Sequence, residues 1–356
     1  MRVLALPDYR KDNPYQHLLA TALSDIGVET QFSVGYKRVL PILRAVLACK
    51  PDVLHLHWPT PYFRGKRGFL RVIYSLRTIF DLTLVRMMGV RLVWTVHNVI
   101  SHDTPSPRLE LTFSRWLSRI ADALIVHSAD AEQEIISEFN VKQKKVSVIK
   151  HGSFSMVYNS VIDHSEAREK LSLPSSGAIV LFFGMVRPYK GVHHLLEAWP
   201  MVLAKLPDAY LVIAGATEDA SYTDRLQSLM EKTEQARLDL RYVPDDEVHL
   251  LMSAANLLAL PFEKSLTSGS VTLANGFGLP IVTTSVSGGA KADNAIFADA
   301  ESPQDLANAI AEAVQTLKRS HVEPVDDWPQ IAGEHLAVYR SDQSDPEQLS
   351  QKRRKP

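Results

Sequence analysis

The stretch FFGMVRPYKGVHHLLEAW, Phe182–Trp199, joins the end of an apolar strand to a loop and then to a helix. Its second half has apolar side chains at helical spacing: Val192, Leu195, Leu196 and Trp199. A strand that leads through a glycine-containing loop into a helix is the repeating unit of parallel α/β sheets. Ligands of such sheets bind beyond the carboxyl ends of the strands. The loop Gly184–Gly191 is therefore the first place to look for a functional site.

The same alternation of strand and helix patterns extends in both directions, and it predicts two successive doubly wound halves. Expected strands of the first half are Val3–Leu6, Val53–Leu56, Leu92–Val96, Ala123–Val126 and Val146–Ile149. Those of the second half are Ile179–Phe183, Tyr210–Ala214, Leu238–Val243, Leu257–Ala259 and Ile281–Thr283. Amphipathic helices are expected over Pro14–Ile26, Ser128–Phe139, Gln304–Leu317 and Trp328–Tyr339.

Composition excludes several classes of protein. The 356 residues include 39 basic and 40 acidic side chains, and this balance gives no reason to expect a nucleic acid partner. The longest apolar region, Phe69–Val90, carries four charged residues, too many for a membrane span. A single cysteine, Cys49, excludes an internal disulfide and favours a reducing, cytoplasmic compartment.

Several motifs in fixed order resemble the family 4 glycosyltransferases. Phe182–Trp199 is similar to their G-R-x-x-x-x-K-G segment, and further matches are HLHWP (55–59), TVHN (95–98), DALIVHSADAE (122–132), VIKHG (148–152), LVIAG (211–215) and VPDDEVHLLMSAANLLALPF (243–262). The resemblance implies the GT-B fold, in which two Rossmann-like domains with parallel sheets face a central cleft. It implies that Arg187 and Lys190 bind the diphosphate of a nucleotide sugar, and that His97 faces the transferred sugar.

The segment KSLTSGSVTLANGFGLPIV, Lys264–Val282, departs from that family. Most members have two glutamates here, and their positions fall on Ser265 and Leu273. One interpretation is that the hydroxyls and backbone N–H groups of the LTSGS turn (266–270) replace the carboxylates around the donor, as in a variant, bacterial exopolysaccharide branch. The other is that the chain is a non-catalytic scaffold or regulatory partner of the same fold. A nucleotide-sugar epimerase of the GT-B type is a third alternative.

The expected domains are residues 1–155 for the acceptor and residues 156–325 for the nucleotide sugar. Residues 326–340 are expected to form a helix that returns to the first domain, and residues 341–356 a disordered basic tail. The predicted donor-binding residues are Gly184, Arg187, Lys190, Ser265, Thr267, Ser268, Gly269, Ser270, His151 and Gly152.

Chemistry agrees with a sugar transferase that uses a UDP- or GDP-sugar and needs no cofactor. The leaving group is a diphosphate, and fixed Arg and Lys side chains can neutralise it as a divalent cation does elsewhere. We therefore expect no metal site, and we interpret His193 and His194 as helix residues. His97 and Asp103 are the catalytic candidates. If the reaction inverts the sugar configuration, Asp8, Asp103 and His97 are all available as the base.

The segment Tyr62–Arg71 mixes aromatic, aliphatic and basic residues, a composition typical of a membrane-interface segment. An ordinary domain helix that packs its apolar side on the sheet is the alternative. The acceptor and membrane candidates are His57, Arg64, Lys66, Arg67 and Arg71. They predict a peripheral protein on the inner face of the cytoplasmic membrane, with a lipid-linked or polysaccharide glycan as acceptor.

Overall fold

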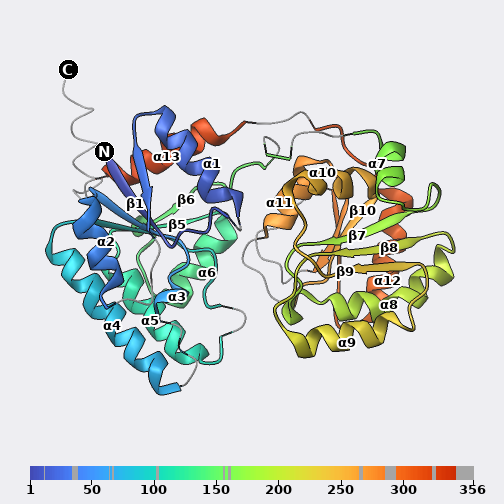
Figure 1. Cartoon of the computed structure of the whole chain (residues 1–356), viewed down its shortest axis with the longest axis horizontal. Helices are drawn as coiled ribbons and strands as arrows, with labels where there is room; N and C mark the ends of the chain where they lie inside the picture. Colours follow the sequence, from blue (N-terminus) through green and yellow to red (C-terminus); the bar gives the residue numbers. More distant parts are fainter. Residues whose placement is uncertain are drawn as a thin grey trace. The chain divides into compact units, whose positions relative to one another are not determined.

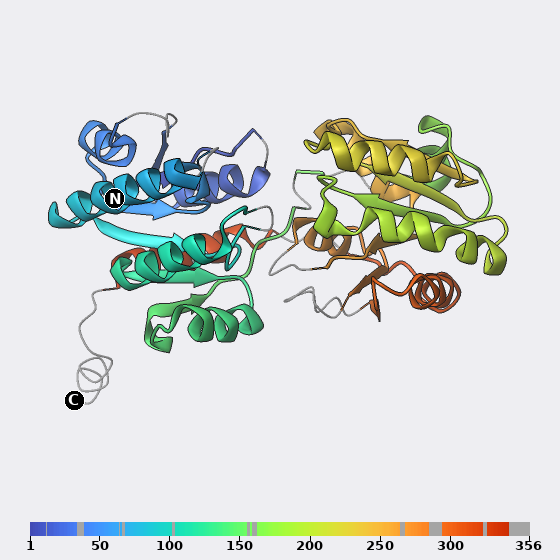
Figure 2. The same ribbon diagram turned by 90° about the horizontal axis from the view of Figure 1, so that it is seen from below.

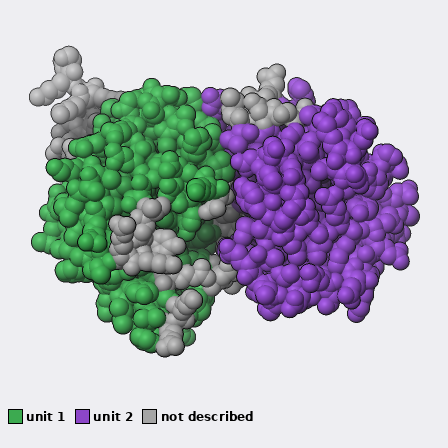
Figure 3. All heavy atoms as spheres, viewed as in Figure 1, with its two compact units in different colours: residues 1–150, 328–356 green, residues 151–327 purple. Residues whose placement is uncertain are grey.

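The computed structural model describes residues 1–11, 13–33, 39–63, 65, 68–101, 104–154, 157–158, 162–263, 268–284, 294–322 and 326–341. The chain forms two compact units, which Figure 3 distinguishes by colour. Unit 1 comprises residues 1–150 and 328–356, and unit 2 comprises residues 151–327.

Unit 1 is built on a six-stranded parallel sheet with the order β2-β1-β3-β4-β5-β6. The strands are β1 (Arg2–Leu6), β2 (Glu29–Phe32), β3 (Val53–Leu56), β4 (Arg91–Thr95), β5 (Ala123–Val126) and β6 (Val146–Val148). The strands β1, β3, β4 and β5 are buried almost throughout and supply the centre of the core. Such continuous apolar runs are expected where helices cover both faces of a parallel sheet.

Helices cover both faces of this sheet, as Figures 1 and 2 show. They are α1 (Pro14–Asp25), α2 (Pro41–Cys49), α3 (Thr60–Phe63), α4 (Gly68–Met87), α5 (Pro107–Ile120), α6 (Ala129–Phe139) and α13 (Trp328–Arg340). The last of these is separated from the rest of unit 1 by the whole of unit 2 in the sequence, and it packs against α1. Its buried residues include Trp328, Ile331 and Tyr339.

Unit 2 repeats the architecture, with the strand order β12-β11-β10-β7-β8-β9. Its strands are β7 (Ile179–Phe183), β8 (Tyr210–Ala214), β9 (Ala236–Asp239), β10 (Leu257–Leu260), β11 (Ile281–Thr284) and β12 (Ala295–Ala298). Its helices are α7 (His164–Lys170), α8 (Val192–Lys205), α9 (Ala220–Met230), α10 (Asp245–Ala254), α11 (Gly269–Gly276) and α12 (Pro303–Thr316). The chain leaves β7 toward β8 on one side and reaches β10 on the other, so the strand order reverses between β7 and β10. Ligands of doubly wound sheets bind at the carboxyl ends of the strands at such a reversal.

The predicted two-domain α/β architecture is confirmed. Most predicted strands lie within a residue of their observed bounds, but the strand expected over Leu238–Val243 is wrong, because β9 spans Ala236–Asp239. The short strands β2 and β12 were not predicted, and each lies at the edge of its sheet. The tail expected over residues 341–356 lies outside the described residues except for Ser341.

Candidate functional site

The loop after β7 brings three predicted donor residues together at the strand reversal. Gly184 has φ +121°, and a Cβ atom placed on it would lie 2.9 Å from Ser270 Oγ and 3.3 Å from Lys190 Nζ. The Ser270 hydroxyl also donates a hydrogen bond of 2.9 Å to the carbonyl of Phe183 at the end of β7. The Lys190 ammonium, the Ser270 hydroxyl and the backbone of Gly184 thus converge at the carboxyl end of β7. A side chain at position 184 would fill the space between them.

Lys190 is the centre of this arrangement. Among the described residues its ammonium forms no ion pair, and it lies 5.7 Å from the centre of the Phe262 ring. Burial lowers the pKa of Lys190 to about 8, and the neighbouring Arg187 cation adds to that effect. A half-buried ammonium without a carboxylate partner has an unmet requirement for negative charge, so an anion is its natural ligand.

Arg187 begins the short 3₁₀ turn Pro188–Lys190 that carries Lys190. Its guanidinium lies 3.6 Å from the carboxylate of Glu218, which is largely exposed. Such an exposed pair contributes little to stability, so the Arg187 guanidinium can leave Glu218 at little cost.

The amino end of α11 faces the same place. Ser268 caps the helix, and its hydroxyl accepts a hydrogen bond from the N–H of Val271. Gly269 lies close to the first residues of unit 2, because a Cβ on it would be 3.7 Å from the Phe154 ring. The predicted residues Ser265 and Thr267 lie outside the described residues.

His151 and Gly152 open unit 2. Gly152 is buried with φ +86°, a conformation that favours glycine. The His151 ring meets the Phe154 ring edge-on, with 5.2 Å between their centres. Through Phe154, this segment therefore reaches the amino end of α11.

In unit 1, the predicted histidines also follow strand ends. His57 follows β3, and His97 lies two residues beyond β4; His97 Nε2 is 3.5 Å from His57 Nδ1. The His97 ring stacks on Trp58 with 4.0 Å between ring centres. Both histidines are buried, so a pair of imidazoles with fixed orientation lies at the carboxyl edge of this sheet. Asp103 lies outside the described residues.

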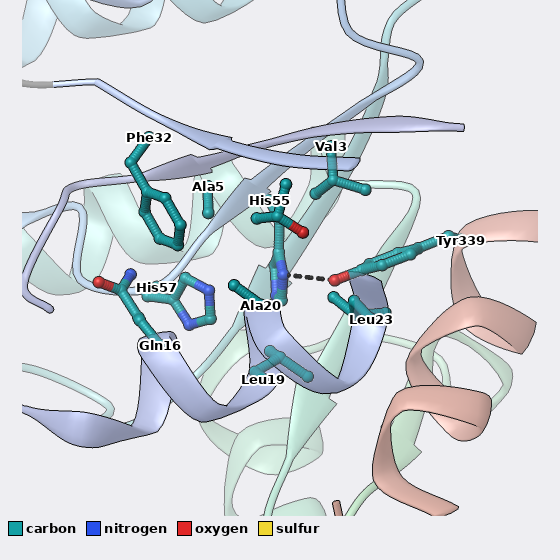
Figure 4. A pocket seen from close by; sticks show the side chains of 11 residues that line it. Val3, Ala5, Gln16, Leu19, Ala20, Leu23, Phe32, His55, His57 and Tyr339 are labelled. Carbon is teal, nitrogen blue, oxygen red and sulfur yellow. Dashed lines mark hydrogen bonds between the residues drawn. The ribbon is translucent and has the colours of Figure 1, made fainter. Parts of the chain in front are cut away.

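Sequence reasoning missed that these two belong to a larger buried cluster. His55, His127, His335, Tyr15 and Tyr339 complete it. Figure 4 shows His55 and His57 beside a small cavity, with the Tyr339 hydroxyl 2.8 Å from His55 Nδ1. The motif DALIVHS could have pointed to His127, because this residue follows β5 directly; nothing local indicated His335 or Tyr339.

Burial keeps the imidazoles of His55, His57, His127 and His335 neutral, because it lowers the pKa of each. It lowers the pKa of His57 to about 3 and the pKa values of His127 and His335 to about 4 each. Neutral imidazoles can accept a proton or orient a hydroxyl, whereas imidazolium ions would repel one another here. Asp8, the other candidate base, hydrogen-bonds to Arg10, which holds the pKa of that carboxyl below its usual range. A lowered pKa makes Asp8 the weaker base.

The candidate membrane residues are placed only in part. Arg71 is half-buried; its Nε donates to the carbonyl of Gly65 at 2.9 Å, and its Nη1 donates to Ser106 Oγ at 2.7 Å. The guanidinium thus holds the start of α4 to the start of α5. Arg64, Lys66 and Arg67 lie outside the described residues. In the described part of the chain, none of the helices combines the length and hydropathy that a bilayer span requires.

Both halves of the chain match known protein families. Residues 3–152 match the family model described as Glycosyltransferase Family 4, and residues 177–316 match the model described as Glycosyl transferases group 1. A GDP-mannose:glycolipid 4-beta-D-mannosyltransferase of Xanthomonas campestris is 26% identical over 339 residues, which cover 92% of this chain and 88% of that protein. A D-inositol 3-phosphate glycosyltransferase of Corynebacterium aurimucosum is 25% identical over 73% of this chain and 62% of its own length.

Solved structures share the fold. A sucrose-phosphate synthase from Thermosynechococcus elongatus superposes with a TM-score of 0.70 at 15% identity, over 95% of this chain and 98% of that one. The structure of Anabaena HepE in complex with UDP-glucose superposes with a TM-score of 0.66 at 18% identity. The match covers 95% of this chain and 99% of that one. Since family models match both halves of a chain with this fold, the chain is a glycosyltransferase of the GT-B type, belonging to Glycosyltransferase Family 4 in its first half and to group 1 in its second.

Proposed function

We propose that the protein transfers a hexose from a UDP- or GDP-sugar to a glycan or a lipid-linked oligosaccharide in bacterial-type polysaccharide synthesis. The observation that carries this proposal is the convergence of Lys190 Nζ and Ser270 Oγ beside Gly184. The Lys190 ammonium can donate hydrogen bonds to a phosphate oxygen, and the helix dipole of α11 favours the same charge. The Ser270 hydroxyl can donate to phosphate by giving up its bond to the carbonyl of Phe183. The GDP-mannose named for the Xanthomonas relative makes GDP-mannose the first donor to test.

In the proposed reaction, the bond between the sugar C1 and the diphosphate oxygen breaks, and the acceptor hydroxyl bonds to C1. Arg187 and Lys190 neutralise the negative charge that develops on the leaving diphosphate, so a divalent ion is not needed on it. The His97 imidazole would stand at the acceptor and take up the hydroxyl proton. His57, whose low pKa makes it a poor base, would orient the His97 ring. Ser265 and Thr267 would join Ser268–Ser270 around the donor.

A thermal-shift panel of UDP, GDP and their sugars tests this donor class. A ligand that binds only the folded protein stabilises it by about 2.7 kcal/mol at a concentration 100 times its Kd. We expect the nucleotides of one base, uracil or guanine, to raise the melting temperature of the protein much more than those of the other base. Absence of a shift with every nucleotide would favour the non-catalytic scaffold, whereas conversion of a UDP-sugar into its epimer without acceptor would favour the epimerase.

We further propose that helix α4 holds the protein on an anionic membrane, where a lipid-linked acceptor resides. The helix exposes an apolar stripe made of Phe69, Val72, Ile73, Leu76 and Phe80, each between 46% and 60% exposed. Their spacing of three, four, seven and eleven residues from Phe69 places them along one side of the helix. The basic residues Arg64, Lys66 and Arg67 directly precede this stripe in the sequence and supply the charge that anionic lipid attracts.

The buried side of α4 explains why its apolar side is left exposed. That side carries the polar residues Ser75, Thr78 and Asp81, followed by the fully buried Leu82 and Val85. The Asp81 carboxylate accepts hydrogen bonds of 2.9 and 2.7 Å from the N–H groups of Ile42 and Leu43, and so caps α2. These polar contacts and the buried Leu82 and Val85 lie on the same side of the helix, so the apolar stripe is turned outward.

Vesicle sedimentation tests the membrane proposal. Leu76→Glu should weaken binding to anionic vesicles about tenfold or more, because burial of a leucine contributes about 1.5–3 kcal/mol. Neutralisation of Arg64, Lys66 and Arg67 should also weaken it. Phe297→Glu is the matched control, since Phe297 is equally exposed in unit 2. Equal sedimentation of Leu76→Glu and wild type would contradict the proposal.

A further inference from the structure

Three side chains of types that commonly bind metals meet next to the loop Gly184–Gly191, which we call the donor loop. The proposed transfer reaction does not use them. His193 and His194 lie in the first turn of α8, and Glu263 follows β10. His194 Nε2 is 3.4 Å and His193 Nε2 is 3.9 Å from Glu263 Oε1. One ligand atom from each residue can be chosen so that all three lie within 4.8 Å of one another.

These separations are close to those of an occupied metal site. Two ligands bound at about 2.0–2.1 Å to a tetrahedral Zn²⁺ lie about 3.4 Å apart. His194 and Glu263 already have this spacing, and His193 is half an ångström wider. The ligand atoms of the two histidines lie within 4.8 Å of each other. Side-chain rotations that draw the two rings together would bring all three atoms to bonding distance of one ion.

The backbone holds the two segments in place. The N–H of Glu263 donates a hydrogen bond of 2.8 Å to the carbonyl of Tyr189. A Cβ on Gly191 would lie only 2.0 Å from the carbonyl oxygen of Pro261, so only glycine permits this close approach. The start of α8 and the end of β10 are thus fixed against each other without any ion.

His193 has a hydrogen-bond partner for its other ring nitrogen, and His194 has a carboxylate near its own. His193 Nδ1 lies 2.9 Å from the hydroxyl of Tyr222, and His194 Nδ1 lies 3.9 Å from the carboxylate of Glu197. Metal-bound histidines typically have such a partner, which orients the ring and fixes the tautomer. If each Nδ1 carries the proton, each Nε2 directs its lone pair toward Glu263. This second layer distinguishes the cluster from a chance group of exposed charges.

We propose that His193, His194 and Glu263 bind one divalent transition-metal ion, with Zn²⁺ as the best match and with a position open to solvent. Two imidazoles and one carboxylate suit Zn²⁺ and its neighbours in the first transition row, whereas Mg²⁺ and Ca²⁺ prefer oxygen ligands alone. The ion ties the start of α8, which follows Lys190, to the residue that precedes Lys264. The ion would have a structural role, because it links two segments beside the donor loop. Neutralisation of the diphosphate would still depend on Arg187 and Lys190.

Titration of the full chain with Zn²⁺, after chelator treatment and removal of any affinity tag, tests this site. We expect one Zn²⁺ per chain, and four- or five-coordinate visible absorption when Co²⁺ replaces it. Tyr222→Phe should weaken binding about 10- to 100-fold, because it removes only the outer partner of His193. His194→Ala and Glu263→Ala should weaken binding further.

His321→Ala is the matched control, since His321 is exposed in the same unit and should leave the affinity unchanged. Circular dichroism of each variant establishes that it folds. Binding that is equally tight in His194→Ala, Glu263→Ala and wild type would overturn the proposal. So would a wild-type protein that takes up no Zn²⁺, in which case the cluster is an ion-paired group only.

Discussion

Lys190 is the residue on which the proposed diphosphate site depends, and its pKa of about 8 is the property most open to experiment. The diphosphate favours the charged ammonium, so bound nucleotide should raise this pKa. Affinity for UDP or GDP should then be constant below about pH 8 and should fall as the pH rises above it. The nucleotide phosphate does not confound the result, because its second pKa is about 6.

Calorimetric titration between pH 6.5 and 9.5 measures this dependence. Near pH 8, binding should also take up protons, which appears as a difference in heat between buffers of different ionisation enthalpy. An affinity that stays flat through pH 9.5 would show that Lys190 does not face the diphosphate.

Sequence reasoning could identify the residues that follow strands directly, such as Arg187, Lys190, His57 and His97. It could not identify the cluster at Glu263, because the closeness of this residue to His193 and His194 depends on the packing of β10 beside β7. The expectation that His193 and His194 are ordinary helix residues came from local sequence alone. Their partners Tyr222 and Glu197 lie on α9 and α8, and only the fold reveals the contact to α9.

At the scale of elements, α4 shows why periodicity is ambiguous. Its sequence has an apolar side and a polar side, and the ordinary expectation is that the apolar side packs on the sheet. In α4 the buried side combines the Asp81 cap on α2 with the buried Leu82 and Val85, and a second apolar stripe stays exposed. Local sequence also fails to predict the edge strands β2 and β12. Each has only four residues, and the sequence ETQF of β2 is mainly polar. Pairing with a neighbouring strand, rather than local propensity, makes them strands.

Helix α13 is attached to unit 1 by a hydrogen bond between elements that are far apart in sequence. The Tyr339 hydroxyl and His55 Nδ1 are 2.8 Å apart and fully buried. Tyr339→Phe removes the hydroxyl and leaves a buried ring nitrogen without that partner, so we expect a loss of about 1–3 kcal/mol in the free energy of unfolding.

Urea unfolding monitored in unit 1 measures this loss. Tyr74→Phe is the control in the same unit, because its ring lies over Arg77 and phenylalanine keeps that contact. A Tyr339→Phe variant as stable as Tyr74→Phe would mean that the bond to His55 contributes nothing to the attachment of α13.

At the scale of the whole molecule, the two-unit architecture followed from the sequence because the strand and helix alternation runs through the chain twice. Each unit has its own six-stranded sheet and its own apolar core. The resemblance to family 4 glycosyltransferases added the function, since the fold alone serves many chemistries. The structure explains one of the two positions at which this chain lacks the glutamate of its family. Leu273 is buried on α11, so an apolar side chain fits there.

The central claim is that the anion site of unit 2 binds the diphosphate of the donor. Calorimetric titration of wild type, Lys190→Ala and the exposed control Lys205→Ala with the nucleotide chosen by the thermal-shift panel tests it most directly. A hydrogen bond to a charged group contributes about 1.5–3 kcal/mol, so Lys190→Ala should raise the Kd about 10- to 150-fold. Lys205→Ala should bind as wild type does. A Lys190→Ala protein that is folded and binds the nucleotide with wild-type affinity would contradict the account.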